Sequence, residues 1–84
     1  MLRFHSDPGH GWLQVTLADV QDVGLSLQSF THYSYRQGNL LFLEEDCDAG
    51  VFMKAYLKKY GREPAYTHTH TDYDSPIRHM PRLT

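Results

Sequence analysis

Residues 40–61 constrain the fold most, because they join an apolar strand segment to one long amphipathic helix. Residues 40–44 are almost continuously apolar, which is typical of a strand inside a sheet. Apolar residues then recur at the i, i+3, i+4, i+7, i+8 and i+11 positions of one helical face, namely Ala49, Phe52, Met53, Tyr56, Leu57 and Tyr60. Asp46 or Asp48 is the expected N-cap, and Gly61 is expected to end the helix in the left-handed conformation.

The remainder of the chain predicts strands that pair around this unit. The expected elements are strands over 11–17, 25–36, 40–44 and 65–72, and a short helical turn over 18–23. The sequence Gln37-Gly38-Asn39 predicts a hairpin turn between the second and third strands. The order predicts an α+β fold, a mainly antiparallel sheet of about four strands with the long helix packed on one face. Residues 74–84, with two prolines, are expected to form an irregular tail of a single domain spanning 1–84.

Composition argues against several classes of partner and setting. The formal net charge is −2, from eight basic and ten acidic residues, so the chain lacks the basic excess typical of nucleic-acid binding. The single cysteine, Cys47, excludes an intramolecular disulfide and favours a reduced compartment. The first residues contain no apolar run and no segment is long enough to span a bilayer, so we expect neither a signal peptide nor a membrane partner.

Alternating histidines near the C-terminus predict a metal site as one alternative. On a strand, His68, His70 and Asp72 fall on one face, where two imidazoles can bind one ion. Further ligands could come from the N-terminal segment, which carries His5, Asp7 and His10. Zinc suits such ligands, and the chain would then be a small zinc-binding protein or a metal-dependent hydrolase. The simpler alternative is a solvated edge strand.

An acidic cluster at the start of the long helix predicts a contact surface for a basic partner. It consists of Glu44, Glu45, Asp46 and Asp48, and the aromatic or titratable residues expected near it are Tyr33, Tyr35 and His32. The alternative is a capped and solvated helix start, because charge runs usually face water. Within this cluster, Cys47 is expected to be a half-buried structural residue, since neighbouring acids disfavour its thiolate.

Four blocks resemble those of a group of small, mostly uncharacterised proteins carried by bacteriophages, prophages and plasmids. The blocks are Ser6-Asp7-Pro8-Gly9-His10-Gly11-Trp12-Leu13, Ser34-Tyr35, Leu43-Glu44-Glu45-Asp46-Cys47-Asp48-Ala49 and Ser75-Pro76-Ile77-Arg78. The resemblance implies an accessory protein of a mobile element in the cytoplasm of a bacterial host. It implies a host protein or protein complex as partner, with inhibition of a defence complex such as CRISPR as one such role.

The sequence contains no complete catalytic constellation, so a non-enzymatic protein that binds a host protein is the first hypothesis. The zinc-binding protein is the second. A third is a homodimer formed through residues 40–43, if that strand lies at an edge of the sheet.

Overall fold

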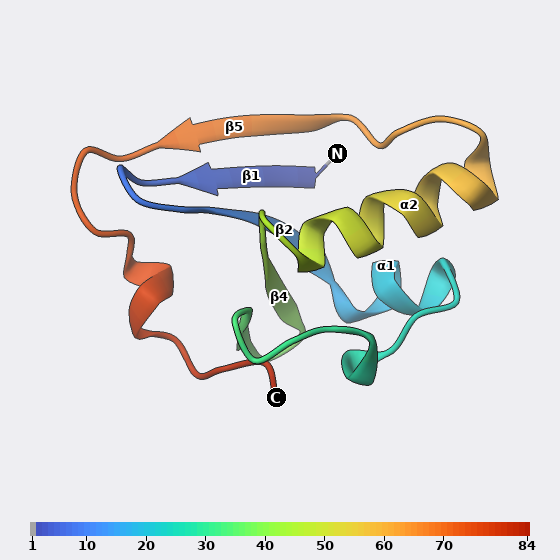
Figure 1. Ribbon diagram of the computed structural model, residues 1–84, viewed down its shortest axis with the longest axis horizontal. Helices are drawn as coiled ribbons and strands as arrows, with labels where there is room; N and C mark the ends of the chain where they lie inside the picture. The colour runs from blue at the N-terminus through green and yellow to red at the C-terminus, as the bar shows by residue number, and fades with distance from the viewer. Residues whose placement is uncertain (1) are drawn as a thin grey trace.

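The computed structural model describes residues 2–84 and shows one open sheet with layers on both faces (Figure 1). The elements are β1 (Leu2–Ser6), β2 (Gly11–Thr16), α1 (Leu17–Asp22), the 3₁₀ turn η1 (Leu27–Ser29), β3 (Tyr35–Gln37), β4 (Leu40–Glu44), α2 (Asp48–Tyr60), β5 (Tyr66–His70) and the 3₁₀ turn η2 (Pro76–His79). The strand order is β3-β4-β2-β1-β5. Neighbouring strands are antiparallel except β1 and β5, which are parallel. The predicted α+β fold is confirmed.

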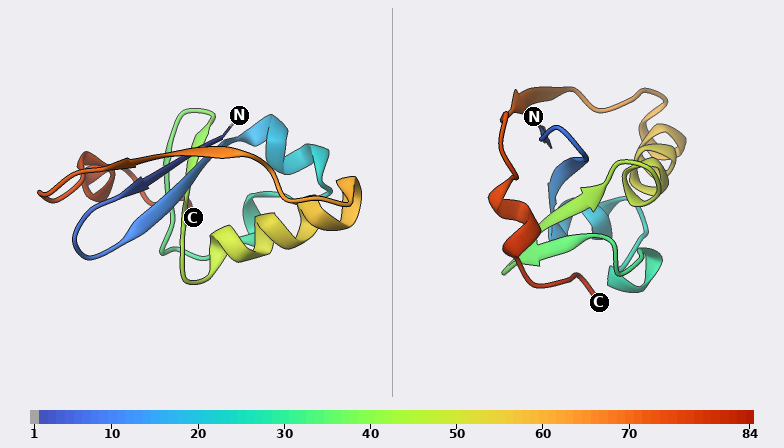
Figure 2. Two further views of the ribbon diagram at one scale, coloured as in Figure 1. Left: turned by 90° about the horizontal axis from the view of Figure 1, so that it is seen from above. Right: turned by 60° about the vertical axis from the view of Figure 1, so that its left-hand side comes forward.

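Strand β1 was not among the expected elements, and it brings the sheet to five strands. It forms a hairpin with β2 across the loop at residues 7–10, and β5 lies beside it in the same direction (Figures 1 and 2). Charged and polar residues interrupt its apolar pattern, because Arg3 and His5 alternate with Leu2 and Phe4. Strand β5 is shorter than the predicted 65–72, and all five of its residues are exposed.

The main core fills the space between one face of the sheet and the two helices. Leu13 of β2 lies opposite Leu43 of β4. These strand residues are buried together with Phe52 from α2 and Val20 from α1. Burial of such apolar side chains is the main force that stabilises the fold. The apolar periodicity of α2 is therefore confirmed in its first turns, whereas its last turn is half-exposed, with Leu57 at 44% and Tyr60 at 40%.

The sequence predicts the C-terminal end of α2 correctly but not its N-cap. Gly61 adopts the left-handed conformation (φ 72°) and its N–H donates to the Leu57 carbonyl over 2.8 Å, as predicted. At the other end, the N-cap is Cys47 and not Asp46 or Asp48, so that prediction is wrong. Asp48 is the first helical residue, and its carboxylate instead accepts hydrogen bonds from the loop at residues 31–34.

The prediction of a strand over 25–36 is wrong for most of that segment. The chain forms η1 and a loop there, and regular pairing begins only at Tyr35. The Ser26 N–H donates to the Ser29 hydroxyl over 3.1 Å, and such local side-chain bonds compete with a strand ladder. The hairpin from β3 to β4 is present, with Gly38 at φ 60°. Because β4 lies between β3 and β2, the dimer through an exposed strand at 40–43 is excluded.

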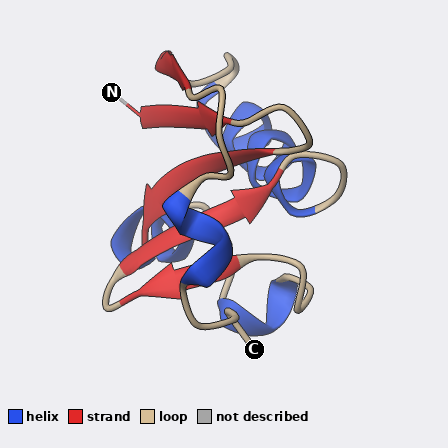
Figure 3. Cartoon of the chain, turned by 90° about the vertical axis from the view of Figure 1, so that its left-hand side faces the viewer, coloured by secondary structure: helices blue, strands red, loops and turns tan. Residues whose placement is uncertain are grey.

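The C-terminal residues are mostly irregular in backbone but are packed against the fold. Turn η2 crosses the sheet on the face opposite α2 (Figure 3), where Ile77 is buried with Trp12 and Phe42. Beyond it, the Arg36 N–H donates to the Pro81 carbonyl and the Leu83 N–H to the Ser34 carbonyl, each over 2.9 Å. The segment therefore keeps the irregular backbone that its prolines favour and forms the second layer of the fold.

Gly11 has a specific packing role in the sheet. A Cβ at this position would lie 2.4 Å from Cζ of Phe4 and 2.8 Å from Oε2 of Glu45. We expect Gly11→Ala to lower the free energy of unfolding by about 1–3 kcal/mol, because the Phe4 ring must move from its packed position.

Gly50→Ala is the matched control. Its Cβ meets nothing within 4 Å on the exposed face of α2, so it should raise stability by about 0.5–1 kcal/mol. Urea denaturation followed by circular dichroism measures the free energy of unfolding of both variants. If the two substitutions changed it equally, Gly11 would have no specific packing role.

Candidate functional site

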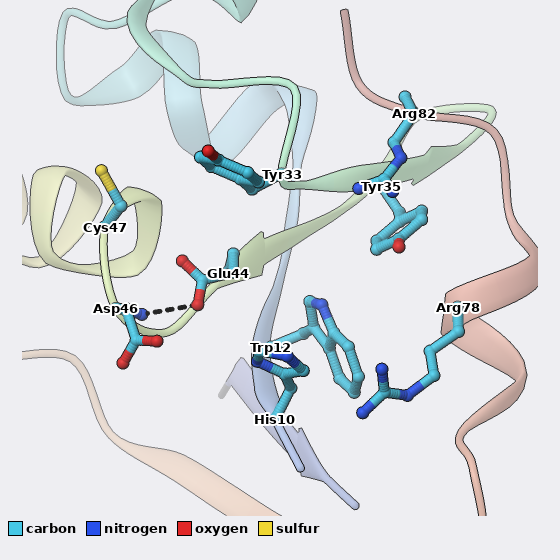
Figure 4. A pocket seen from close by; sticks show the side chains of 9 residues that line it. All are labelled: His10, Trp12, Tyr33, Tyr35, Glu44, Asp46, Cys47, Arg78 and Arg82. Atoms are coloured by element: carbon cyan, nitrogen blue, oxygen red, sulfur yellow. Dashed lines mark hydrogen bonds between the residues drawn. The ribbon is translucent and has the colours of Figure 1, made fainter.

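A pocket of about 450 Å³ lies where β2 begins and β4 ends, between these strands and the C-terminal segment. We call it the Trp12 pocket. It is lined by His10, Trp12, Tyr33, Tyr35, Glu44, Asp46, Cys47, Arg78 and Arg82 (Figure 4). These residues come from four separate parts of the chain, so the pocket exists only in the folded protein.

Aromatic rings and arginines form one side of the Trp12 pocket. The rings of Trp12 and Tyr35 meet edge to face with centroids 6.4 Å apart. The Arg78 guanidinium lies 5.4 Å from the Trp12 ring and that of Arg82 lies 4.6 Å from the Tyr35 ring, which are cation–π distances. Tyr33 is 55% exposed at the rim. Trp12 is only 2% exposed and forms the floor of the pocket, so the contact surface consists of the tyrosines and arginines held against it. Held in this way, they lose little side-chain entropy when a ligand binds.

A buried ion pair fixes this arginine wall. Asp7 accepts two hydrogen bonds from Arg78, with Nε–Oδ2 at 2.6 Å and Nη2–Oδ1 at 2.8 Å. It also accepts the backbone N–H groups of Gly9, His10 and Ser75 at 3.0, 2.9 and 2.9 Å. The Arg78 guanidinium holds the pKa of Asp7 well below its usual range, against the opposing effect of burial. Its oxygens are fully engaged, so Asp7 positions Arg78 and is not free to bind the metal ion for which the sequence proposed it.

The opposite side of the pocket is acidic. Glu44 is only 8% exposed, and one of its carboxylate oxygens accepts the Asp46 N–H over 3.0 Å. Burial raises the pKa of Glu44, and the negative charge of Asp46 adds to the increase. His10 lies beside them: one potential ligand atom from each of His10, Glu44 and Asp46 lies within 4.8 Å of the others. The pocket thus places an acidic wall opposite an arginine wall.

The residues predicted to contact a partner divide among three places. Tyr33, Tyr35, Glu44 and Asp46 line the pocket, and His32 lies beside it with its ring 4.5 Å from that of Tyr33. Glu45 is exposed toward the other face of the sheet, next to Gly11. Asp48 is 1% exposed and bonded to Thr31 and Ser34, so its assignment to a contact surface is wrong.

The histidines predicted as metal ligands are divided between the two faces of the sheet. His68 Nε2 and His70 Nδ1 each lie 2.8 Å from the Ser6 hydroxyl, and His70 Nε2 lies 3.4 Å from Asp72. His5 points to the opposite face, where its Nε2 is 2.8 Å from Gln14. Within residues 2–84, the one group of three such side chains with ligand atoms inside 4.8 Å is His10 with Glu44 and Asp46. Of the six predicted ligands, only His10 belongs to it.

Sequence reasoning missed the contribution of Trp12, Arg78 and Arg82 to the site. Arg78 and Arg82 lie in a segment with two prolines that is expected to be irregular, and nothing local links them to β2 or β3. One signal was present: the four blocks that carry the resemblance contain seven of the nine lining residues, all except Tyr33 and Arg82. Cys47, expected to be half-buried, is exposed at the pocket rim.

Comparison with protein-family models, curated proteins and solved structures finds no match. None of the helices in the described part of the chain has the length and apolar character needed to cross a membrane. The functional assignment therefore rests on the geometry of the pocket and on the chemistry of its walls.

Proposed function

We propose that this chain is a non-enzymatic binding protein whose Trp12 pocket receives an exposed segment of a protein partner. The observation that carries the proposal is a preformed pocket in which Trp12 and Tyr35, each with an arginine against its ring, face Glu44 and Asp46. Tryptophan, tyrosine and arginine are the residues that contribute most to binding energy at protein interfaces. Four of the seven residues predicted to contact a partner line this pocket, namely Tyr33, Tyr35, Glu44 and Asp46.

The size and charge of the pocket support a segment of polypeptide as its occupant. About 450 Å³ is within the range of pockets that hold a small ligand or a few side chains. The Arg82 side chain on one wall and the Asp46 side chain on the other are both exposed, so they can steer and orient a segment that carries both signs of charge. Tyr33 at the rim adds apolar contact area as the segment enters.

The resemblance to proteins of mobile elements indicates which partners to test first. It favours a host protein or complex in the bacterial cytoplasm, and a defence complex such as CRISPR is the first to examine. This part of the proposal rests on the resemblance, whereas the location of the contact rests on the pocket.

Capture from a bacterial host lysate tests the proposal, with an immobilised chain whose C-terminus is free. Tyr33→Ala, Asp46→Lys and Arg82→Glu alter exposed pocket residues and should each reduce recovery of one stoichiometric partner at least about tenfold. Lys54→Glu and Lys58→Glu, on the exposed side of α2, each make the same change of charge as Arg82→Glu and should leave recovery unchanged. Raising the salt concentration should weaken capture. The assignment would be refuted if the pocket variants still captured the partner and the α2 variants did not.

A further inference from the structure

Three potential metal ligands converge at the acidic wall of the Trp12 pocket from two separate segments. His10 lies in the turn before β2, whereas Glu44 and Asp46 lie at the end of β4 and just after it. Their potential ligand atoms all lie within 4.8 Å of one another. Around a tetrahedral ion with bonds of about 2.1 Å, ligand atoms are about 3.4 Å apart. The three side chains therefore need to close by at most about 1.4 Å to bind one ion.

The charges at this wall favour a cation. Glu44 is more than nine-tenths buried and its carboxylate faces the pocket beside that of Asp46 (Figure 4). Within residues 2–84 the ion pairs are Lys59–Asp22, His70–Asp72 and Arg78–Asp7, and neither Glu44 nor Asp46 takes part in one. Burying a negative charge costs free energy unless an opposite charge compensates it. One divalent ion would compensate the charges of both Glu44 and Asp46.

The surroundings allow the required closure. The backbone of Glu44 is fixed in β4, and its carboxylate accepts a hydrogen bond from the Asp46 N–H. In metal sites, hydrogen bonds of this kind hold a ligand in the orientation that binds the ion. His10 and Asp46 are exposed, so their side chains have room on the solvent side to turn toward Glu44. The hydrogen bonds that tie these two residues to the fold come from their backbones, since the His10 N–H donates to Asp7 and the Asp46 N–H to Glu44. The His10 ring lies beside the Trp12 ring, with centroids 6.1 Å apart.

We infer that His10, Glu44 and Asp46 bind one zinc ion at the acidic wall of the Trp12 pocket. One imidazole and two carboxylates are ligands that zinc accepts, and an N/O site of this kind prefers zinc to manganese. Three protein ligands leave a coordination position open toward the pocket, beside Trp12 and Tyr33. The site differs from the alternating histidines of β5, which lie on another face and share the Ser6 hydroxyl.

Isothermal titration of the chelator-treated chain with zinc tests this inference. We expect about one equivalent to bind with a Kd below about 10 µM, and manganese to bind at least about tenfold more weakly. His10→Ala, Asp46→Asn and Glu44→Gln should each raise the Kd for zinc at least about tenfold. The first two alter exposed side chains, so their circular dichroism spectra should match that of the unaltered chain.

Two control variants separate this site from other zinc ligands in the chain. The double variant His68→Ala/His70→Ala and the variant Cys47→Ser should retain the Kd within about twofold, because neither removes a proposed ligand. The inference is overturned if no zinc binds below about 100 µM, if His10→Ala and Asp46→Asn leave the Kd unchanged, or if either control abolishes binding. It does not rest on the proposed partner, since the titration uses the isolated chain and partner capture is scored separately.

Discussion

Replacing Asp48 by alanine is expected to lower the free energy of unfolding by at least about 3 kcal/mol, the largest effect of a single polar substitution in this chain. Asp48 accepts the Thr31 N–H over 3.0 Å, the Thr31 hydroxyl over 2.8 Å and the Ser34 hydroxyl. The Ser34 oxygen in turn accepts the Glu44 N–H over 3.0 Å. One carboxylate thus joins the start of α2, the loop before β3 and the end of β4. Alanine would leave several buried donors without an acceptor.

Urea denaturation of Asp48→Ala beside Glu45→Gln measures this effect. The control removes the same charge three residues earlier, from an exposed side chain, and should change stability by no more than about 0.5 kcal/mol. Because Glu44 lies in the same network, Asp48→Ala should also weaken partner capture. If the two variants lose equal stability, the net charge of the segment matters and the hydrogen-bond network does not.

Asp7→Asn is the second substitution with a large expected effect, and it should lower the melting temperature by at least about 10 °C at pH 7. The amide cannot accept both hydrogen bonds from Arg78 and leaves that guanidinium without its counter-ion. The bond from the Ser75 N–H is weakened at the same time, so residues 75–83 should lose protection from hydrogen exchange before the rest of the chain. Asp72→Asn, at an exposed position, is the control and should leave the melting temperature unchanged.

The difference in melting temperature between the unaltered chain and Asp7→Asn should become smaller as the pH falls. The pKa of Asp7 in the folded state is held below its unfolded value of about 4, so its contribution to stability is present above that pH. The contribution is lost as pH falls further toward the folded pKa. The melting temperatures of the unaltered chain and of Asp7→Asn should therefore converge as the pH is lowered from 4 to 2. A difference that stays constant over this range would contradict the assigned ion pair.

Local patterns predicted the elements whose residues interact with near neighbours in sequence. The spacing of Ala49 and Phe52, the stop at Gly61 and the turn at Gly38 are each properties of one short segment, and each is present. The prediction of a strand over 25–36 is wrong because it rests on the aromatic and hydroxyl residues of that segment. Serine hydroxyls and the distant carboxylate of Asp48 instead hold the segment in a loop. The sequence did not predict strand β1, because its apolar pattern is too short to identify a strand without the pairing to β2 and β5.

The candidate site was harder to predict than the fold, because it is built from pairings across the chain. The acidic cluster and the tyrosines were identified, yet only the structure separates Glu44 and Asp46 in the pocket from Asp48 inside the fold. Arg78 reaches the site through Asp7, over a separation of 71 residues that no spacing rule reveals. The sequence groups His10 with the histidines of β5 as potential metal ligands, but the potential ligands beside it lie at the end of β4.

The central claim, that the Trp12 pocket receives the partner, is tested most directly at the only tryptophan of the chain. Incorporation of 5-fluorotryptophan gives one ¹⁹F resonance, from Trp12, and leaves the partner invisible to the measurement. Saturation with the captured partner should shift this resonance, and the shift should be lost with Tyr33→Ala and kept with Lys54→Glu. A stoichiometric complex that leaves the resonance of Trp12 unchanged would place the contact elsewhere on the molecule and contradict the account.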